Sequence, residues 1–212
     1  MTEKPYRQID IRTWSRKELF HHFLNFEDPF FNITSSVDVT RLMDFCKKEN
    51  QSFFLSYMFF ATNAANEIPE FRLRLLHKHL VEYPVIHSGS TILNPDDTFS
   101  FCYFDQDDNL YRFLEKGRIA IEELRKKGGV EPREDQLDMI HCSTIPWLSF
   151  TSFKHARRGG QEDSIPKLVF GKVYEDHGKK WMPVSVEVHH ALMDGLHVGR
   201  FFECFQQKIR TL

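Results

Sequence analysis

The sequence lacks closely spaced cysteines, strong net charge and long apolar runs. Its four cysteines include no CxxC pair, which argues against a disulfide framework or a structural zinc site and favours reduced thiols. A formal net charge of -2 leaves no positive excess for binding nucleic acid or acidic membranes. The first residues lack the apolar run of a secretory signal, and no later segment approaches the length that spans a bilayer. We therefore expect a soluble, cytoplasmic protein whose partners include neither nucleic acids nor membranes.

Apolar and aromatic residues are plentiful instead. A hydrophobic fraction of 41% in 212 residues suffices for one sizeable core, so we expect a single domain over residues 1–212. The chain also contains 21 phenylalanines, and aromatic side chains bring large apolar areas into cores and interfaces. This content indicates a large core or a contact between subunits.

Strand-like and helix-like patterns alternate along the chain, which is typical of an α/β fold. Alternating apolar residues predict strands over 6–11, 30–37, 138–145, 166–174 and 182–190, with several short ones within 71–103. Helical spacing predicts helices ending near Asn25 and Lys48, one over 53–65, one over 110–124 and one from Leu196. Ser15 and Glu18 form an S-x-x-E capping box that is expected to open the first helix, with Arg16 in its first turn.

The most distinctive segment is VSVEVHHALMDG at 184–195, a strand that runs into two histidines and a D-G turn. Since strand faces alternate, His190 should share the side of the preceding valines and be more desolvated than His189. Desolvation disfavours the imidazolium, so His190 is a candidate general base for a hydroxyl group. The simpler interpretation is that both histidines merely end a strand.

A metal site is a further alternative for these residues. Four side chains of the types that bind zinc lie close in sequence, namely His189, His190, Asp194 and His197. Consecutive strand residues point to opposite faces, which weakens this interpretation. We expect no metal.

Three separated blocks resemble the chloramphenicol acetyltransferase family. They are IDIRTWSRKE at 9–18, STIPWLSFTSF at 143–153 and HHALMDGLHVGRFF at 189–202. The last block contains the His-x-x-x-Asp-Gly spacing of the CoA-dependent acyltransferases. The similarity extends to 30–38 and 166–188, whereas residues 65–135 do not align securely.

The resemblance implies an acetyl-CoA-dependent O-acetyltransferase, with chloramphenicol as the leading acceptor, and hence a role in antibiotic resistance. It implies that His190 is the base and that Ser143 donates a hydrogen bond to the oxyanion of the tetrahedral intermediate. Asp194 would pair with Arg16 and tie the N-terminal helix to the catalytic turn. Cys142 would have no nucleophilic role.

Further positions are implied by the same resemblance. Trp147 and Lys172 match positions near CoA, and Phe31 matches an aromatic residue of the acceptor pocket. Phe23 stands where the drug-acetylating enzymes usually have tyrosine, and Val169 where they have threonine. Because polar contacts carry much of specificity, these two losses point to looser or altered acceptor discrimination. Ser52 replaces a frequent lysine near CoA.

The resemblance implies a two-layer sandwich, in which helices cover a mixed β-sheet, and a homotrimer with active sites between subunits. Two other functions remain open: an O-acetyltransferase for another hydroxylated xenobiotic or metabolite, and a catalytically silent trimer that binds small molecules. Relatives that act on carrier-bound acyl groups rank last, because the chain has no carrier domain and lacks the length of a two-lobed enzyme.

Overall fold

The computed structural model describes residues 5–128, 132–133, 135–157 and 162–212. Within these ranges the α-helices are α1 (Lys17–Leu24), α2 (Thr40–Lys48), α3 (Phe53–Asn66), α4 (Leu110–Lys127) and α5 (Gly195–Arg210). Short 3-10 helices occupy Ile11–Thr13 and Pro69–Arg72. No helix in the described ranges is both long and apolar enough to cross a membrane.

The strands form one large mixed sheet and one small antiparallel sheet. The strands are β1 (Arg7–Gln8), β2 (Phe30–Asp38), β3 (Leu73–Leu76), β4 (His79–Glu82), β5 (His87–Leu93), β6 (Phe99–Phe104), β7 (Met139–Ile145), β8 (Lys167–Gly171), β9 (Tyr174–Asp176) and β10 (Lys179–His189). The large sheet has the order β2-β10-β8-β7-β5-β6, with β9 paired to β10, and the small one has the order β1-β4-β3. The pairs β5–β7 and β7–β8 are parallel and the others are antiparallel.

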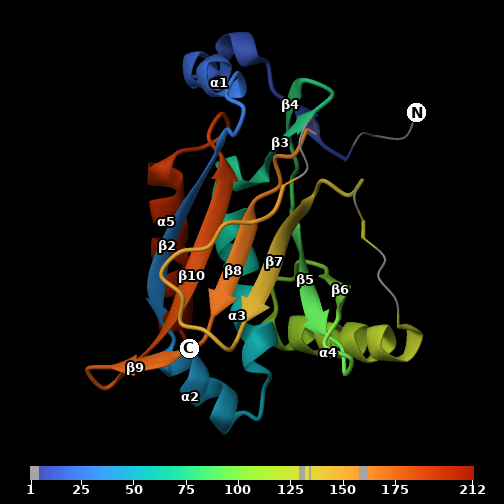
Figure 1. Cartoon of the computed structure of the whole chain (residues 1–212), viewed down its shortest axis with the longest axis vertical. Helices are drawn as coiled ribbons and strands as arrows, with labels where there is room; N and C mark the ends of the chain where they lie inside the picture. Colours follow the sequence, from blue (N-terminus) through green and yellow to red (C-terminus); the bar gives the residue numbers. More distant parts are fainter. Residues whose placement is uncertain (1–4, 129–131, 134, 158–161) are drawn as a thin grey trace.

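The helices α3 and α5 lie behind the large sheet in Figure 1, and the expected two-layer α/β fold is confirmed. Alternate residues of β10, the valines at 184, 186 and 188, are fully buried in the same core cluster as α3 and α5 residues such as Met58 and Phe201. This explains why α3 is apolar on nearly all sides, since it is packed between the sheet and its neighbouring helices.

The other face of the large sheet is covered by an irregular segment. Residues 146–157 and 162–166 follow β7 and cross in front of β8 and β10 (Figure 1). The backbone N–H of His155 and the guanidinium of Arg157 both donate to the Glu187 carboxylate of β10. The polar side chains of Ser185 and Glu187 are therefore buried although no helix covers them.

Two local expectations near the N-terminus are wrong. The helix α1 begins at Lys17, its N-cap is Arg16, and no side chain caps it, so Ser15 does not form a capping box. The strand predicted over 6–11 shortens to Arg7–Gln8, because Ile11–Thr13 forms a 3-10 turn that the Asp10 side chain caps. At both places tertiary contacts, and not local helix propensity, decide the backbone conformation.

Candidate active site

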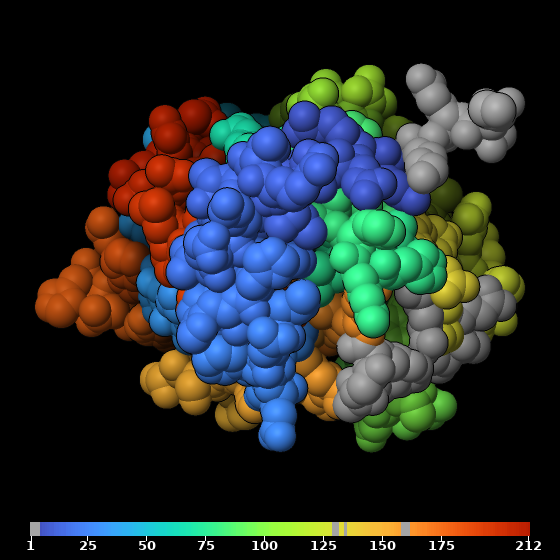
Figure 2. Space-filling model, turned by 90° about the horizontal axis from the view of Figure 1, so that it is seen from above, coloured from blue at the N-terminus to red at the C-terminus, as the bar shows by residue number. Residues whose placement is uncertain are grey.

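His190 is the first residue after strand β10, at the end of the sheet beneath α1. Its backbone N–H donates to the carbonyl of Pro29 at 2.7 Å, which fixes the chain just beyond the strand. The imidazole stacks on the Phe23 ring of α1, with 3.7 Å between centroids and 8° between planes, and contacts Phe31 at 4.6 Å. Figure 2, viewed from this end, shows the N-terminal residues spread across it. The structure thus brings three predicted site residues together.

The two nitrogens of the His190 ring differ in their surroundings. Nδ1 is buried and has no hydrogen-bond partner among the described residues. Nε2 is not buried in this way, although the ring as a whole is only partly exposed. A neutral imidazole with an accessible acceptor nitrogen can take a proton from an alcohol.

His189 and not His190 is the more buried imidazole, so the expected order of desolvation is wrong. His189 is 4% exposed, and its Nδ1 accepts the Ala191 backbone N–H. Burial and, to a smaller extent, the nearby charge of Arg157 together lower its pKa to about 4. The reason is that residues 146–157 cover the face on which His189 lies, whereas His190 projects past the strand end.

An ion pair joins the turn after β10 to the N-terminal helix. The Arg16 guanidinium donates to the Asp194 carboxylate and, at 3.4 Å, to the carbonyl of His190. Burial acts to raise the pKa of Asp194, but the hydrogen bond and charge of Arg16 outweigh it and lower the pKa. Asp194 also precedes α5, where its backbone N–H donates to Nδ1 of His197. Arg16 thus holds the turn that carries His190 against α1, which carries Phe23.

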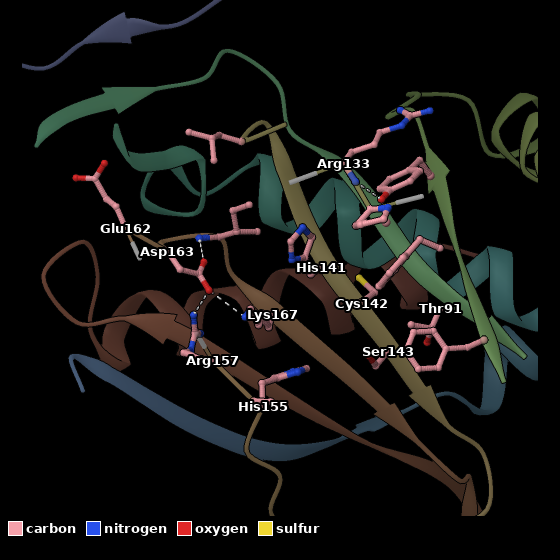
Figure 3. A pocket seen from close by; sticks show the side chains of 18 residues that line it. Thr91, Arg133, His141, Cys142, Ser143, His155, Arg157, Glu162, Asp163 and Lys167 are labelled. Atoms are coloured by element: carbon pink, nitrogen blue, oxygen red, sulfur yellow. Dashed lines mark hydrogen bonds and ion pairs between the residues drawn. The ribbon is translucent and has the colours of Figure 1, made fainter. Parts of the chain in front are cut away.

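Ser143 lies elsewhere, on the open face of β7. It lines a cavity of about 510 Å³ between the strands β5 to β8 and the crossing segment (Figure 3). Its register partner is Val169 of β8, which pairs with Ser185 of β10. Val169 is fully buried beside Ser143. It shares the face of Ser185, whereas Phe31 pairs with Val188 on the helix-covered face, so Val169 lies apart from the other two acceptor-pocket candidates, Phe23 and Phe31.

A single chain does not bring Ser143 and His190 to one reacting atom. Ser185, level with Ser143 two strands away, precedes His190 by five residues, which at strand spacing separates the two side chains by roughly 15–20 Å. They also differ in direction, because Ser143 faces the cavity whereas His190 contacts Phe31, the neighbour of Val188 on the helix-covered face.

The positions matched to CoA contacts lie at the far end of β7 and β8. Trp147 is 61% exposed, and Lys172 is also exposed. The backbone N–H of Lys172 donates to the Leu148 carbonyl at 2.9 Å, so the two turns adjoin. Ser52 has a structural task, because its Oγ accepts the Leu55 N–H and caps α3.

Neither thiol nor metal chemistry gains support from the geometry. Cys142 is buried, and desolvation raises the pKa of its thiol. Among the described residues, no three His, Cys, Asp or Glu side chains are grouped so that they could hold a metal ion.

The sequence reasoning missed most of the cavity walls. His141 shares a strand face with Ser143 and pairs with Lys167, and period-two alternation could have found it. His155, Arg157 and Asp163 come from the irregular crossing segment, which carries no periodic signal. The prediction of a less polar acceptor site was based on Phe23 and Val169 alone and did not take these polar groups into account.

The sequence and the fold both match known proteins over nearly the whole chain. A profile of the family described as chloramphenicol acetyltransferase matches residues 4–206. The chain is 30% identical over 200 residues to a chloramphenicol acetyltransferase of Bacillus pumilus, covering 93% of this chain and 90% of the relative. It is 31% identical over 202 residues to one from Proteus mirabilis, covering 94% and 92%.

Solved structures give the same match. A chloramphenicol acetyltransferase structure superposes with a TM-score of 0.91 at 30% identity, covering 96% of this chain and 99% of the other. The cubic core of the pyruvate dehydrogenase multienzyme complex superposes with a TM-score of 0.65 at 16% identity, covering 99% and 91%, which shows a shared fold alone.

Proposed function

Because the chain belongs to the chloramphenicol acetyltransferase family and is an acyltransferase, we propose that His190 and Ser143 carry out its reaction, the acetyl-CoA-dependent O-acetylation of chloramphenicol. The observation that carries these roles is the placement of His190, whose Nδ1 is buried while its ring lies between Phe23 and Phe31. The acetyl group passes directly, without a covalent acyl-enzyme.

Nε2 of His190 accepts the proton of the acceptor hydroxyl as its oxygen attacks the thioester carbonyl. A carbon–oxygen bond forms, and the carbonyl electron pair moves onto an oxyanion, to which the Ser143 hydroxyl donates a hydrogen bond. When the carbon–sulfur bond breaks, the imidazolium returns the proton to the CoA thiolate. Arg16 and Asp194 position the histidine and do not touch the reacting atoms.

The separation of Ser143 from His190 within one chain supports an active site shared between subunits. We propose a homotrimer in which His190 of one subunit faces the cavity of the next. The roughly 15–20 Å between the two groups exceeds the reach of a single tetrahedral intermediate. A closed cyclic assembly repeats such a heterologous contact without leaving an open end.

Trp147 and Lys172 are proposed to bind acetyl-CoA, since both are exposed at adjoining turns next to the strands that bear Ser143 and Val169. A cytoplasmic location follows from this choice of cosubstrate. Phe23, Phe31 and Val169 are proposed to contact the acceptor from the two sides of the shared site.

Thiol release from acetyl-CoA with chloramphenicol as acceptor tests the proposal on the wild type and on His190→Ala. We expect the variant to lose about 10²- to 10⁴-fold in kcat while keeping its circular dichroism spectrum and acetyl-CoA affinity. A variant that keeps a substantial rate would reject His190 as the base. A wild type that prefers another alcohol would replace chloramphenicol as the acceptor.

A further inference from the structure

The cavity beside Ser143 continues along the sheet past the position of the reacting atoms. His141 lies on the same face of β7 as Ser143, two residues earlier, and is therefore roughly 7 Å from it along the strand. Lys167 is the register partner of His141 on β8, and Glu187 is the partner of Lys167 on β10. A polar row thus crosses the sheet one step beyond the proposed oxyanion donor.

The charged groups of this row already neutralise one another. The Arg157 guanidinium donates to Glu187 at 2.8 Å and to Asp163 at 2.7 Å, and the Lys167 ammonium donates to Asp163 at 3.0 Å. Figure 3 shows both cations directed at Asp163. With Arg133 and Glu162, which also line the cavity, three cations face three anions, so an additional charged ligand group would leave a poorly solvated net charge in the cavity.

Two imidazoles of the cavity have unused hydrogen-bonding capacity. His141 forms no side-chain hydrogen bond with the described residues, and Nε2 of His155 is buried and unpartnered among them. Burial lowers the pKa of each to about 4, and the charge of Lys167 adds to the effect on His141. Each ring is therefore neutral at pH 7 and offers one donor and one acceptor nitrogen.

The facing wall of the cavity is largely apolar. Phe99, Phe101 and Tyr103 of β6 line it, together with Leu137. The hydroxyl of Tyr103 accepts the Arg133 backbone N–H at 2.7 Å, so one of its bonds is already made. A ligand in this cavity therefore meets an apolar surface on one side and two imidazoles on the other.

We propose that His141 and His155 form a second acceptor-recognition site, which binds a neutral group able both to donate and to accept hydrogen bonds. This inference rests on the proposed function, because it takes Ser143 to mark where the reactive hydroxyl lies. The preferred acceptors are alcohols with an apolar body and a hydroxyl or carboxamide group at its far end.

A matched series of primary alcohols measures what the polar group at the far end of the acceptor contributes. The probes are 2-phenylethanol and its 4-hydroxy, 4-carboxamide and 4-carboxylate derivatives, assayed by thiol release from acetyl-CoA with the full-length protein. For the wild type we expect kcat/KM to be about tenfold higher for the 4-hydroxy and 4-carboxamide alcohols than for the parent, the size of one or two net hydrogen bonds. The carboxylate should show no such advantage, because the polar row is charge-balanced.

His141→Phe should lower kcat/KM for the polar alcohols relative to that for 2-phenylethanol, so that the preference falls to about onefold. His141→Gln, which keeps a donor and an acceptor, should retain most of the preference and guards against a folding defect in the first variant. His79→Phe, at an exposed histidine of β4, is the matched control and should behave as the wild type.

The outcomes separate this inference from the proposed function. Turnover that depends on His190 but shows no preference for the polar alcohols, or keeps that preference in His141→Phe, would overturn the second recognition site and leave the acetyltransferase intact. A preference for the carboxylate would overturn the neutral-group rule. No turnover of any alcohol by the wild type would reject both.

Discussion

The end of the sheet at His190 and the cavity at Ser143 are built in different ways. The His190 end is held by the turn 190–194, the adjacent start of β2 and one ion pair to α1. The Ser143 cavity depends on the register of four strands and on a segment without regular structure. The first region is a small aromatic cluster at the end of one strand, while the second combines charged groups, imidazoles and an apolar wall from four strands and the crossing segment. If His190 and Ser143 act together as proposed, neither region is complete within a single chain.

Disabling the two regions in different chains tests whether they form one site between subunits. Ser143→Ala alone should lower kcat about 10²- to 10³-fold, and His190→Ala alone at least as much. If sites form between subunits, co-refolding the two variants in equal amounts should restore about a quarter of wild-type activity, since random mixing gives that share of sites both intact groups.

Refolding each variant separately and mixing the products afterwards is the control for that experiment. The rate of thiol release should then stay at the sum of the two residual activities, because stable assemblies do not exchange chains. Co-refolded chains that show only this sum would contradict a shared site.

The contrast between the two adjacent histidines predicts a pH effect on stability. The pKa of His189 is lowered to about 4 in the folded protein, whereas an unfolded histidine titrates near 6.5. The stability that depends on a neutral His189 is therefore intact above pH 6.5 and is lost as the pH falls toward 4. The free energy of unfolding should fall by about 2–3 kcal/mol between pH 7 and 4.5 for this reason. Denaturant unfolding of the wild type and His189→Gln across this range measures it.

The variant should lose less stability on acidification than the wild type. His177→Gln, at an exposed histidine between β9 and β10, is the control and should follow the wild type. Equal losses in all three proteins would mean that His189 is not the buried neutral imidazole described above.

The ion pair that fixes the His190 end should have the smallest effect of the three. In Asp194→Asn we expect kcat to fall about tenfold with an unchanged KM for acetyl-CoA, because a small displacement of the base slows proton transfer. The free energy of unfolding should fall by about 1–2 kcal/mol, less than for a fully buried pair because Asp194 is 31% exposed.

A second substitution tests whether the loss of stability in Asp194→Asn comes from the broken ion pair. Arg16→Gln added to Asp194→Asn should recover part of the stability, since it removes the unpaired guanidinium. Glu115→Gln, which breaks an exposed pair with Arg118 on α4, should change neither rate nor stability measurably. A KM effect without a kcat effect in Asp194→Asn would contradict the positioning role.

Local patterns predicted the α/β fold and most elements well. Alternation placed β2, β7 and β10 within a few residues, and the apolar run at 53–65 predicted the buried helix α3. Prediction was weakest where a distant contact decides the backbone. Ser15 does not cap α1, and His189 is more buried than His190 because a segment more than thirty positions away in the sequence covers it.

Local sequence patterns were enough to predict the fold class, the family and the residue types at the strand end, because period-two alternation and the His-x-x-x-Asp-Gly spacing are local properties of the chain. Tertiary structure alone decided that Ser143 and His190 lie far apart on different faces, and that His141, His155 and Lys167 share one cavity. Strand register and the path of an irregular segment depend on contacts between residues far apart in sequence, which no local pattern encodes.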